Sequence, residues 1–234
     1  IVAQNNMNQN IIALVPCRAG SQRVPGKNTK AFADGKSLAQ IKIEQLLAID
    51  AVTKIMVSTD DSEVKEIANR FDSEKIEIHE RDPYYASSEC RNDEFVSYFA
   101  DEIQDDGLLL WTHVTSPFCT ADVYKRAIAA YYSDTTHDSL VSVTPLQGYI
   151  WNKDGSPVNY SVDQGRWPNT QTIDPLYHIN SAIFLIPLVD FRTIKNRVGK
   201  RPLFFEMNEY ESFDIDWQKD FELAQHLYSH VSKS

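Results

Sequence analysis

Two periods of apolar and polar positions alternate along the chain. Short, almost continuous apolar runs, typical of strands buried on both faces, lie at residues 11–15, 54–58, 75–79, 108–114 and 139–144. Segments with the helical period of apolar residues lie at 37–49, 62–71, 93–103, 121–132 and 217–231. Strands that alternate with helices in this order predict an α/β fold with a mainly parallel sheet.

The alternation is interrupted between residues 145 and 178. Tryptophan, glycine and proline residues divide this segment into short pieces, and we expect hairpins and loops that leave the main body. An excursion rich in aromatic side chains needs a partner surface. The remainder of residues 7–234 is long enough for one domain with a sizeable core, whereas residues 1–6 precede Met7 and are expected to be a leader or a disordered start.

A basic loop follows the first apolar run. Its sequence, RAGSQRVPGKN, contains two glycines and the cations Arg18, Arg23 and Lys27. Glycine lets backbone N–H groups approach a ligand, and the cations suit oxyanions such as a triphosphate. The loop has neither the GxxxxGK[ST] nor the GxGxxG spacing, which disfavours a dinucleotide-binding oxidoreductase. On composition alone, an ordinary basic surface loop is an equally good interpretation.

Two carboxylates stand close together before the last helical segment, in the sequence SFDID. In an extended segment, Asp214 and Asp216 point to the same side while Ile215 turns towards the core. Hard oxygen ligands placed in this way suit Mg²⁺ that is shared with substrate phosphates. The alternative is that Asp216 only caps the helix that follows.

Composition narrows the possible partners. The net charge of −10 argues against a nucleic-acid-binding protein, because phosphate backbones require a basic face. No apolar stretch approaches the roughly 18 to 20 residues that span a membrane, and the first residues lack the pattern of a signal peptide. The three cysteines form no CxxC motif and are odd in number, which favours a reducing compartment. We therefore expect a cytoplasmic protein without membrane or nucleic-acid partners.

These motifs resemble those of the acylneuraminate cytidylyltransferases, the CMP-sialic acid synthetases. The basic loop is similar to the family pattern RxGSxxxPxKN, Ser58-Thr59-Asp60 matches a family STD, and residues 212–216 match S-x-DID. The resemblance extends over nearly the whole chain. It implies a three-layer α/β/α, Rossmann-like nucleotidyltransferase fold with a small protruding dimerisation subdomain at 145–178, and hence a homodimer whose partner helps to close the sugar pocket.

The resemblance also implies roles for individual residues. It assigns CTP binding to Arg18, Ser21, Lys27, Asn28, Arg81 and Asn92. It assigns sugar binding to His113, Thr115, Ser116, His178 and Asn180. Two of these depart from the family pattern, since His113 stands where the family has Gln and His178 where it has Arg. A neutral histidine cannot replace a permanent bidentate cation, so the identity of the sugar stays open.

The implied reaction is the transfer of CMP from CTP to a 2-keto-3-deoxy sugar acid, with release of pyrophosphate. Its catalytic residues would be Arg18, Lys27, Asp214 and Asp216, and the two aspartates would hold Mg²⁺. Sialic, legionaminic and pseudaminic acids are all possible substrates. The octulosonate of lipopolysaccharide is disfavoured because THVTSP stands where its enzymes have a QGDEP-like segment. A catalytically weak family member that only binds nucleotide is the other alternative.

Overall fold

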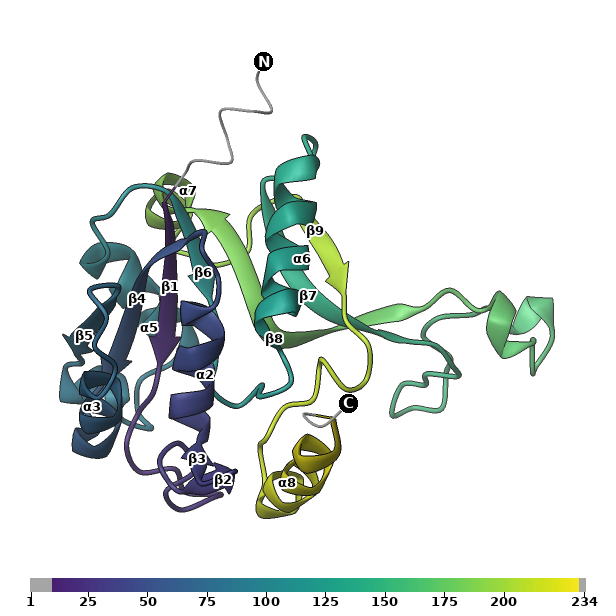
Figure 1. The fold of residues 1–234 in the computed structure, drawn as a ribbon. Helices are drawn as coiled ribbons and strands as arrows, with labels where there is room; N and C mark the ends of the chain where they lie inside the picture. Colours follow the sequence, from purple (N-terminus) through teal and green to yellow (C-terminus); the bar gives the residue numbers. More distant parts are fainter. Residues whose placement is uncertain (1–9, 232–234) are drawn as a thin grey trace.

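A seven-stranded sheet forms the centre of the protein, and the computed structural model describes residues 10–231 (Figure 1). The strand order is β5-β4-β1-β6-β8-β7-β9. The strands are β1 Ile11–Pro16, β4 Val52–Thr59, β5 Ile76–Glu80, β6 Leu108–Trp111, β7 Ser139–Leu146, β8 Leu176–Pro187 and β9 Pro202–Glu206. Only β8 runs antiparallel to its neighbours, β6 and β7, so the prediction of a mainly parallel sheet is confirmed.

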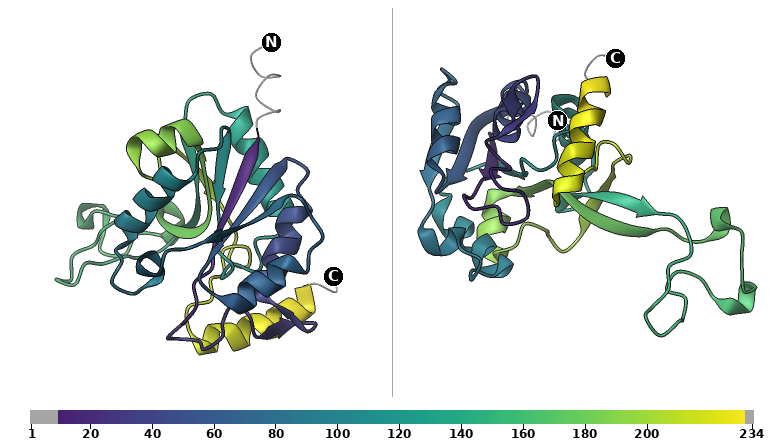
Figure 2. Two further views of the ribbon diagram at one scale, coloured as in Figure 1. Left: turned by 90° about the vertical axis from the view of Figure 1, so that its left-hand side faces the viewer. Right: turned by 90° about the horizontal axis from the view of Figure 1, so that it is seen from below.

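Helices cover both faces of the sheet, as the left view of Figure 2 shows. They are α2 Leu38–Leu47, α3 Ser62–Asn69, α4 Pro83–Ala86, α5 Asn92–Glu102, α6 Ala121–Ser133, α7 Leu188–Ile194 and α8 Gln218–Val231. A short antiparallel pair, β2 Ala31–Ala33 and β3 Lys36–Ser37, lies outside the main sheet. Ala13 packs in the apolar cluster of α2, α3, α6 and α8, whereas Leu14 packs in that of α5 and α7. The continuous apolar run of β1 therefore reflects a strand buried on both faces, in the predicted three-layer fold.

The predicted elements differ from the observed ones where the apolar pattern is weak. The helix α7 and the strand β9 were not expected, because α7 has only seven residues and β9 is a half-exposed edge strand. The segment between β5 and α5, which lacks a clear apolar period, contains the single helical turn α4. Strand β6 ends at Trp111 rather than at Val114. Asp61 caps α3, since its carboxylate accepts a hydrogen bond from the N–H of Glu63 at 2.9 Å.

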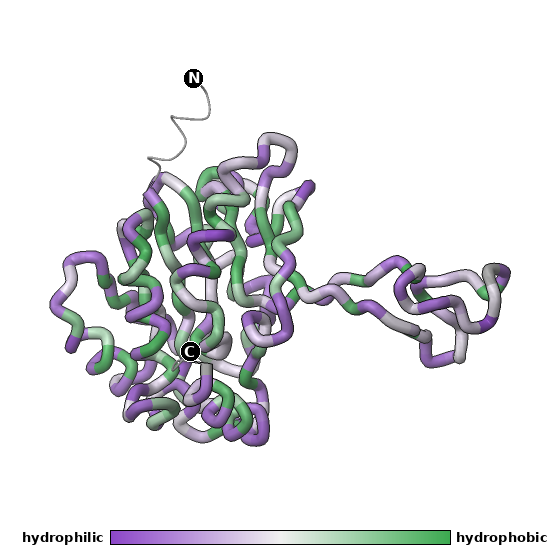
Figure 3. The backbone as a smooth tube through the Cα atoms, turned by 45° about the vertical axis from the view of Figure 1, so that its right-hand side comes forward, coloured by the Kyte–Doolittle hydropathy of each residue, from purple (hydrophilic) through white to green (hydrophobic). Residues whose placement is uncertain are grey.

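An arm projects from the body between β7 and β8 (Figures 1 and 3). The two strands continue outwards as a ribbon, and the arm beyond them holds the 3₁₀ turns η2 Val162–Gln164 and η3 Thr170–Thr172. Trp151 and Trp167 stack at its surface, with ring centroids 5.9 Å apart, and Tyr149 packs edge-on against Trp167. The right view of Figure 2 shows that the arm extends well beyond the layers of the body. The expected excursion of loops and exposed aromatic side chains is present.

No helix within residues 10–231 is both long and apolar enough to cross a membrane. The expected leader at 1–6 lies outside the described residues.

Ser181 marks the point where β8 changes from the body to the arm. Its φ of 62° lies in the left-handed region, where a side chain costs roughly 1 kcal/mol relative to glycine. We expect Ser181→Gly to raise the free energy of unfolding by about 0.5–1 kcal/mol, measured by urea denaturation. Ser181→Ala keeps the Cβ and is the control, which should not stabilise the protein. Destabilisation by the glycine variant would contradict the strained backbone.

Candidate active site

The carboxyl ends of four parallel strands meet at one edge of the sheet, where open α/β sheets bind ligands. The basic loop follows β1, and the N–H of Ala19 donates to the carboxylate of Asp60 after β4 at 2.8 Å. Arg81 follows β5, and its N–H donates to the carbonyl of Thr59 at 3.2 Å. The segment that contains the two aspartates joins them, since the N–H of Ile215 donates to the carbonyl of Thr115 after β6 at 2.9 Å.

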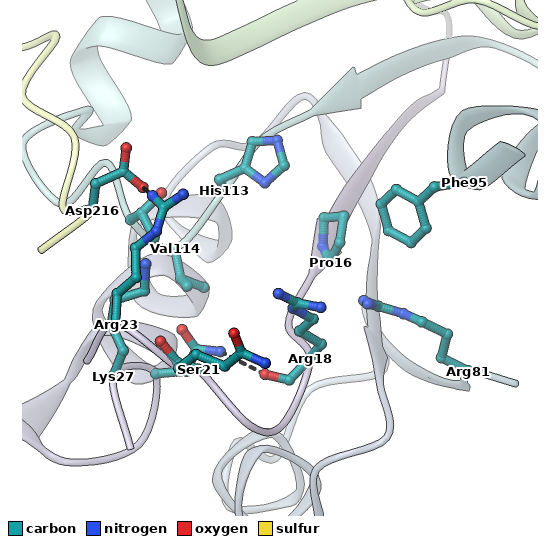
Figure 4. A pocket seen from close by; sticks show the side chains of 13 residues that line it. Pro16, Arg18, Ser21, Arg23, Lys27, Arg81, Phe95, His113, Val114 and Asp216 are labelled. Carbon is teal, nitrogen blue, oxygen red and sulfur yellow. Dashed lines mark hydrogen bonds and ion pairs between the residues drawn. The ribbon is translucent and has the colours of Figure 1, made fainter. Parts of the chain in front are cut away.

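A cavity of about 410 Å³ opens between these loops (Figure 4). It is lined by Pro16, Arg18, Ser21, Gln22, Arg23, Lys27, Asn28, Arg81, Phe95, His113, Val114, Thr115 and Asp216. Eight of these were singled out from the sequence: Arg18, Ser21, Lys27, Asn28, Arg81, His113, Thr115 and Asp216. The structure therefore brings together residues separated by nearly 200 positions in the chain.

The basic loop curls back on itself so that its cations reach the cavity. Gly26 has a φ of 61°, a conformation that glycine adopts without strain, and its carbonyl accepts hydrogen bonds from the N–H groups of Thr29 and Lys30. The side chain of the buried Asn28 donates to the carbonyl of Arg18 at 3.1 Å and joins the two ends of the loop. The Asn28 side chain therefore holds the conformation of the loop that carries Arg18.

Three of the cations are anchored by neutral acceptors. Arg18 donates to the carbonyls of Ala86 and Ser87 at the end of α4, at 3.3 and 3.2 Å, and Lys27 donates to that of Ile215 at 2.8 Å. The buried Arg81 donates to Ser58 and lies 5.0 Å from the centroid of the Phe95 ring. Within residues 10–231, none of the three forms an ion pair with a carboxylate. Their charge is available to an anionic ligand.

The two aspartates lie close to these cations. Asp216 forms a half-exposed ion pair with Arg23 at 3.0 Å. Burial lowers the pKa of Lys27, and the negative charges of Asp214 and Asp216 partly oppose that shift. Ile215 is fully buried, as expected. Desolvation and the negative charge of Asp216 raise the pKa of the Asp214 carboxyl, which accepts a hydrogen bond from the Thr115 side chain. Two like charges held together in this way would be relieved by a cation.

The hydrogen bonds do not favour the alternative in which Asp216 only caps α8. The carboxylate of Asp220 accepts hydrogen bonds from the N–H groups of Asp216 and Trp217 at 3.2 and 2.8 Å. The part of the chain that is described contains no group of three or more His, Cys, Asp or Glu side chains that could hold a metal. Two carboxylates alone fit Mg²⁺, which is usually bound by one or two carboxylates together with water and substrate phosphates.

The loop after β6 rests on a buried lysine. The Lys42 ammonium donates to the carbonyls of Ser116 and Cys119 at 3.0 and 3.2 Å and to the Tyr124 hydroxyl at 2.7 Å. The Tyr124 hydroxyl in turn meets that of Thr112 at 2.6 Å. Burial lowers the pKa of Lys42 to about 8. This network ties the segment that follows β6 to α2 and α6.

Five of the predicted residues lie outside the lining of the cavity. Asn92 is the first residue of α5 and lines a neighbouring cavity together with Arg18 and Arg81. Ser116 is buried over Lys42, and Asn180 is buried in the sheet, where it accepts from the Ser142 hydroxyl at 2.6 Å.

The other two predicted residues outside the lining differ in their surroundings. His178 is exposed on the outer part of β8, opposite Thr144. Asp214 does not line the cavity, but it accepts a hydrogen bond from the Thr115 side chain and its charge acts on Lys27, and both of these residues line the cavity.

Several residues of the site were missed or undervalued in the sequence. Arg23 was noted only as a charge, yet it pairs with Asp216 and lies 4.8 Å from the centroid of the Trp217 ring. Phe95 lies on α5, and its apolar character gave no functional signal. Arg197 touches His113 from a loop without periodicity, so that only its charge could have indicated a role.

Comparison with known proteins places the chain in a family. The sequence model of the cytidylyltransferase family matches residues 12–231, and the chain therefore belongs to that family of nucleotidyltransferases. It is 27% identical over 223 residues to the N-acylneuraminate cytidylyltransferase of Escherichia coli, which covers 93% of this chain and 52% of that protein. It is 26% identical over 227 residues to the CMP-N,N'-diacetyllegionaminic acid synthase of Legionella pneumophila, covering 93% and 95%. The chain thus spans about half the length of the first relative. The predicted family is confirmed.

Solved structures agree on the fold. A 4-diphosphocytidyl-2C-methyl-D-erythritol synthase from Anaerococcus prevotii superposes with a TM-score of 0.68 at 13% identity, covering 96% of this chain and 98% of that one. A CMP:2-keto-3-deoxy-manno-octonic acid synthetase in complex with CTP superposes with a TM-score of 0.65 at 15% identity, covering 95% and 99%. At these identities the likeness shows a shared fold, which confirms the predicted nucleotidyltransferase-like architecture.

Proposed function

We propose that this protein transfers CMP from CTP to a 2-keto-3-deoxy sugar acid and releases pyrophosphate. The observation that carries the proposal is a cavity where Arg18, Lys27 and Arg81, which form no ion pair within residues 10–231, lie beside the loop of the two aspartates. Cations suit a triphosphate, and paired carboxylates suit the Mg²⁺ that accompanies it. The names of the relatives, which include a synthase of CMP-N,N'-diacetyllegionaminic acid, support a sugar acid as the second substrate.

In the proposed reaction, the anomeric hydroxyl of the sugar attacks the α-phosphorus of CTP. A bond forms between that oxygen and phosphorus, and the bond from phosphorus to the oxygen bridging to the β-phosphate breaks. Arg18, Lys27 and Arg81 stabilise the charge that accumulates on the departing pyrophosphate. The proton of the hydroxyl passes to one of the two aspartates or to solvent. No side chain needs to act as a nucleophile.

Asp214 and Asp216 would hold the Mg²⁺. When bound, the ion screens the phosphate oxygens and supplies Lewis-acid stabilisation of the reacting group. For Asp216 to bind it, the carboxylate must exchange its ion pair with Arg23, which is half exposed and therefore weak. Arg23 is then free to turn towards the phosphates.

The proposal is tested by pyrophosphate release from CTP and Mg²⁺ with four acids: N-acetylneuraminate, legionaminate, pseudaminate and 3-deoxy-manno-octulosonate. Release with one acid and not with CTP alone would support the reaction and identify the sugar. A protein that binds CTP but releases no pyrophosphate with any of the four would match the alternative of a nucleotide-binding member without turnover.

We also propose that the protein acts as a homodimer in the cytoplasm. The arm exposes Val162 and Trp167 by 57% and 62%, and apolar side chains gathered on a projection favour burial against another surface. A partner's arm laid over the body would help to close the sugar side of the cavity. The described cysteines are all free, which suits a reducing compartment.

Loss of these arm side chains is expected to weaken the dimer. For the double variant Val162→Ser/Trp167→Ser we expect the dissociation constant to rise about 30-fold or more, because a central tryptophan contributes about 2 kcal/mol or more to an interface. Analytical ultracentrifugation measures it. Val189→Ser removes an equally exposed valine, 62% accessible, from α7 on the body and is the matched control. A dimer that is equally stable in all three proteins would exclude the arm as its interface.

A further inference from the structure

His113 makes its hydrogen bonds through one ring nitrogen. The indole N–H of Trp111 donates to its Nε2 at 3.2 Å, and the guanidinium of Arg197 lies 3.5 Å from the same atom. Trp and Arg side chains carry donors only. Two donors that converge on Nε2 require it to be the unprotonated acceptor, so the single proton of the neutral imidazole resides on Nδ1.

The ring is held neutral. Burial, followed by the positive charge of Arg197, lowers the pKa of His113 to about 3. The further charged groups that act on the ring are Lys42, Arg81 and Lys27, which are also cations. An Nδ1–H group in such a positive field favours an anionic acceptor over a neutral one.

Arg197 is fixed in place behind the histidine. Its guanidinium carbon lies 4.2 Å from the centroid of the Phe184 ring and 5.1 Å from that of Trp111. Among residues 10–231 it has no carboxylate partner, and burial lowers its pKa to about 10, far above neutrality. It is therefore a permanent, uncompensated charge. Arg197 does not line the cavity, whereas His113 does, on the side opposite Arg18 in Figure 4.

We propose that Trp111 and Arg197 lock His113 as a fixed Nδ1–H donor and that this donor binds the carboxylate of the acid substrate. Arg197 is a positioning residue, because it acts through His113. The inference rests on the proposed function for the identity of that acid. The hydrogen bond and the charge are thus divided between two residues: His113 donates, and Arg197 supplies the field.

The tautomer is tested without any activity. In long-range ¹H–¹⁵N spectra of the full chain labelled at histidine, we expect the His113 resonance to show a protonated Nδ1 and a bare Nε2 between pH 6 and 8. A protonated Nε2 would overturn the proposal, whether or not the protein is an enzyme. The His113→Asn variant assigns the signal by its disappearance.

Kinetics test the carboxylate. For Arg197→Met, which keeps the apolar stem, we expect KM for the acid to rise roughly 10- to 100-fold, with KM and Kd for CTP changed less than twofold. His113→Leu should do the same, whereas His113→Asn, which keeps a donor near the position of Nδ1, should retain most of the affinity. Lys200→Met removes an exposed charge from the same loop, without contact to His113, and is the control. Weaker CTP binding in Arg197→Met would mean that His113 and Arg197 contribute to nucleotide binding and would refute the proposal.

A ligand change completes the test. Replacing the C1 carboxylate of the productive acid by its amide should weaken binding to the wild type but make little difference to Arg197→Met and His113→Leu. Equal sensitivity in all three proteins would show that the carboxylate lies elsewhere. If none of the four acids supports pyrophosphate release, the proposed function fails. A change in the chemical shift of the His113 Nδ1–H signal on addition of pyruvate, the smallest 2-keto acid, then decides whether His113 binds a carboxylate.

Discussion

Replacement of Asp216 by asparagine is expected to lower Mg²⁺-dependent pyrophosphate release by roughly three orders of magnitude. A metal ion contributes several kcal/mol to the stabilisation of such a transition state, and each 1.36 kcal/mol is about a tenfold change in rate. The amide keeps the size of the side chain, and Asp216 is exposed, so that the fold should be unaffected. The rate is measured as a function of Mg²⁺ concentration, and the melting temperature is measured in parallel.

The ion pair with Arg23 makes a second explanation possible, and a second variant separates the two. If Asp216 binds the metal, high Mg²⁺ should restore part of the activity of Asp216→Asn. Arg23→Met should lose less, roughly tenfold, and should not respond to Mg²⁺. If Asp216 served only to hold Arg23, the two variants would behave alike and Mg²⁺ would rescue neither. Glu209→Gln changes an exposed carboxylate of the same connection between β9 and α8 and is the control.

The sequence predicted the cations of the basic loop and the paired carboxylates because both are local motifs. Lys27 and Asp216 are far apart in the chain, but each belongs to a short segment whose residue types carry their own chemical meaning. The strand ends that bring them together follow from the alternation of strands and helices. In such cases local pattern and topology suffice to predict which side chains meet.

The side of the cavity proposed to bind the sugar could not be predicted in this way. Its neighbours come from loops and from a bend in a strand, where no period indicates direction. Ser181, with its left-handed backbone, separates the buried Asn180 from the strand that enters the core, and His178 lies outside on the ribbon of the arm. Ser116 does not line the cavity, and Lys42 holds its carbonyl in the buried interior.

The role of Arg197 shows the limit of reading residues one at a time. In the sequence, two histidines stood where a family amide and a family cation were expected, which left the identity of the sugar open. In the structure, a cation does stand behind one of them, supplied by the loop after α7. This cation could not be inferred from the residue types at the family positions, and only the three-dimensional contact between His113 and Arg197 reveals it.

Replacement of Lys27 by methionine is expected to lower kcat/KM for CTP by roughly 100-fold, as loss of one donor to a developing oxyanion does elsewhere. Two functions would be lost together. Within residues 10–231 the ammonium forms no ion pair with a carboxylate and is available to the phosphates. Its hydrogen bond to the Ile215 carbonyl at 2.8 Å ties the basic loop to the aspartates. We therefore expect weaker CTP binding by isothermal titration calorimetry as well as slower turnover.

Lys30→Met provides the matched control for Lys27. It lies in the same part of the chain and loses the same charge, but its ammonium lies 4.0 Å from the centroid of the Phe221 ring and bonds to Gln218, outside the cavity lining. The affinity of this variant for CTP should stay within about twofold of the wild type, since a solvent-accessible charge outside the cavity contributes little through solvent. Equal losses in the two variants would mean that net charge, and not the position of Lys27 in the cavity, attracts the nucleotide. A selective loss in Lys27→Met would locate the triphosphate at the junction of the two motifs.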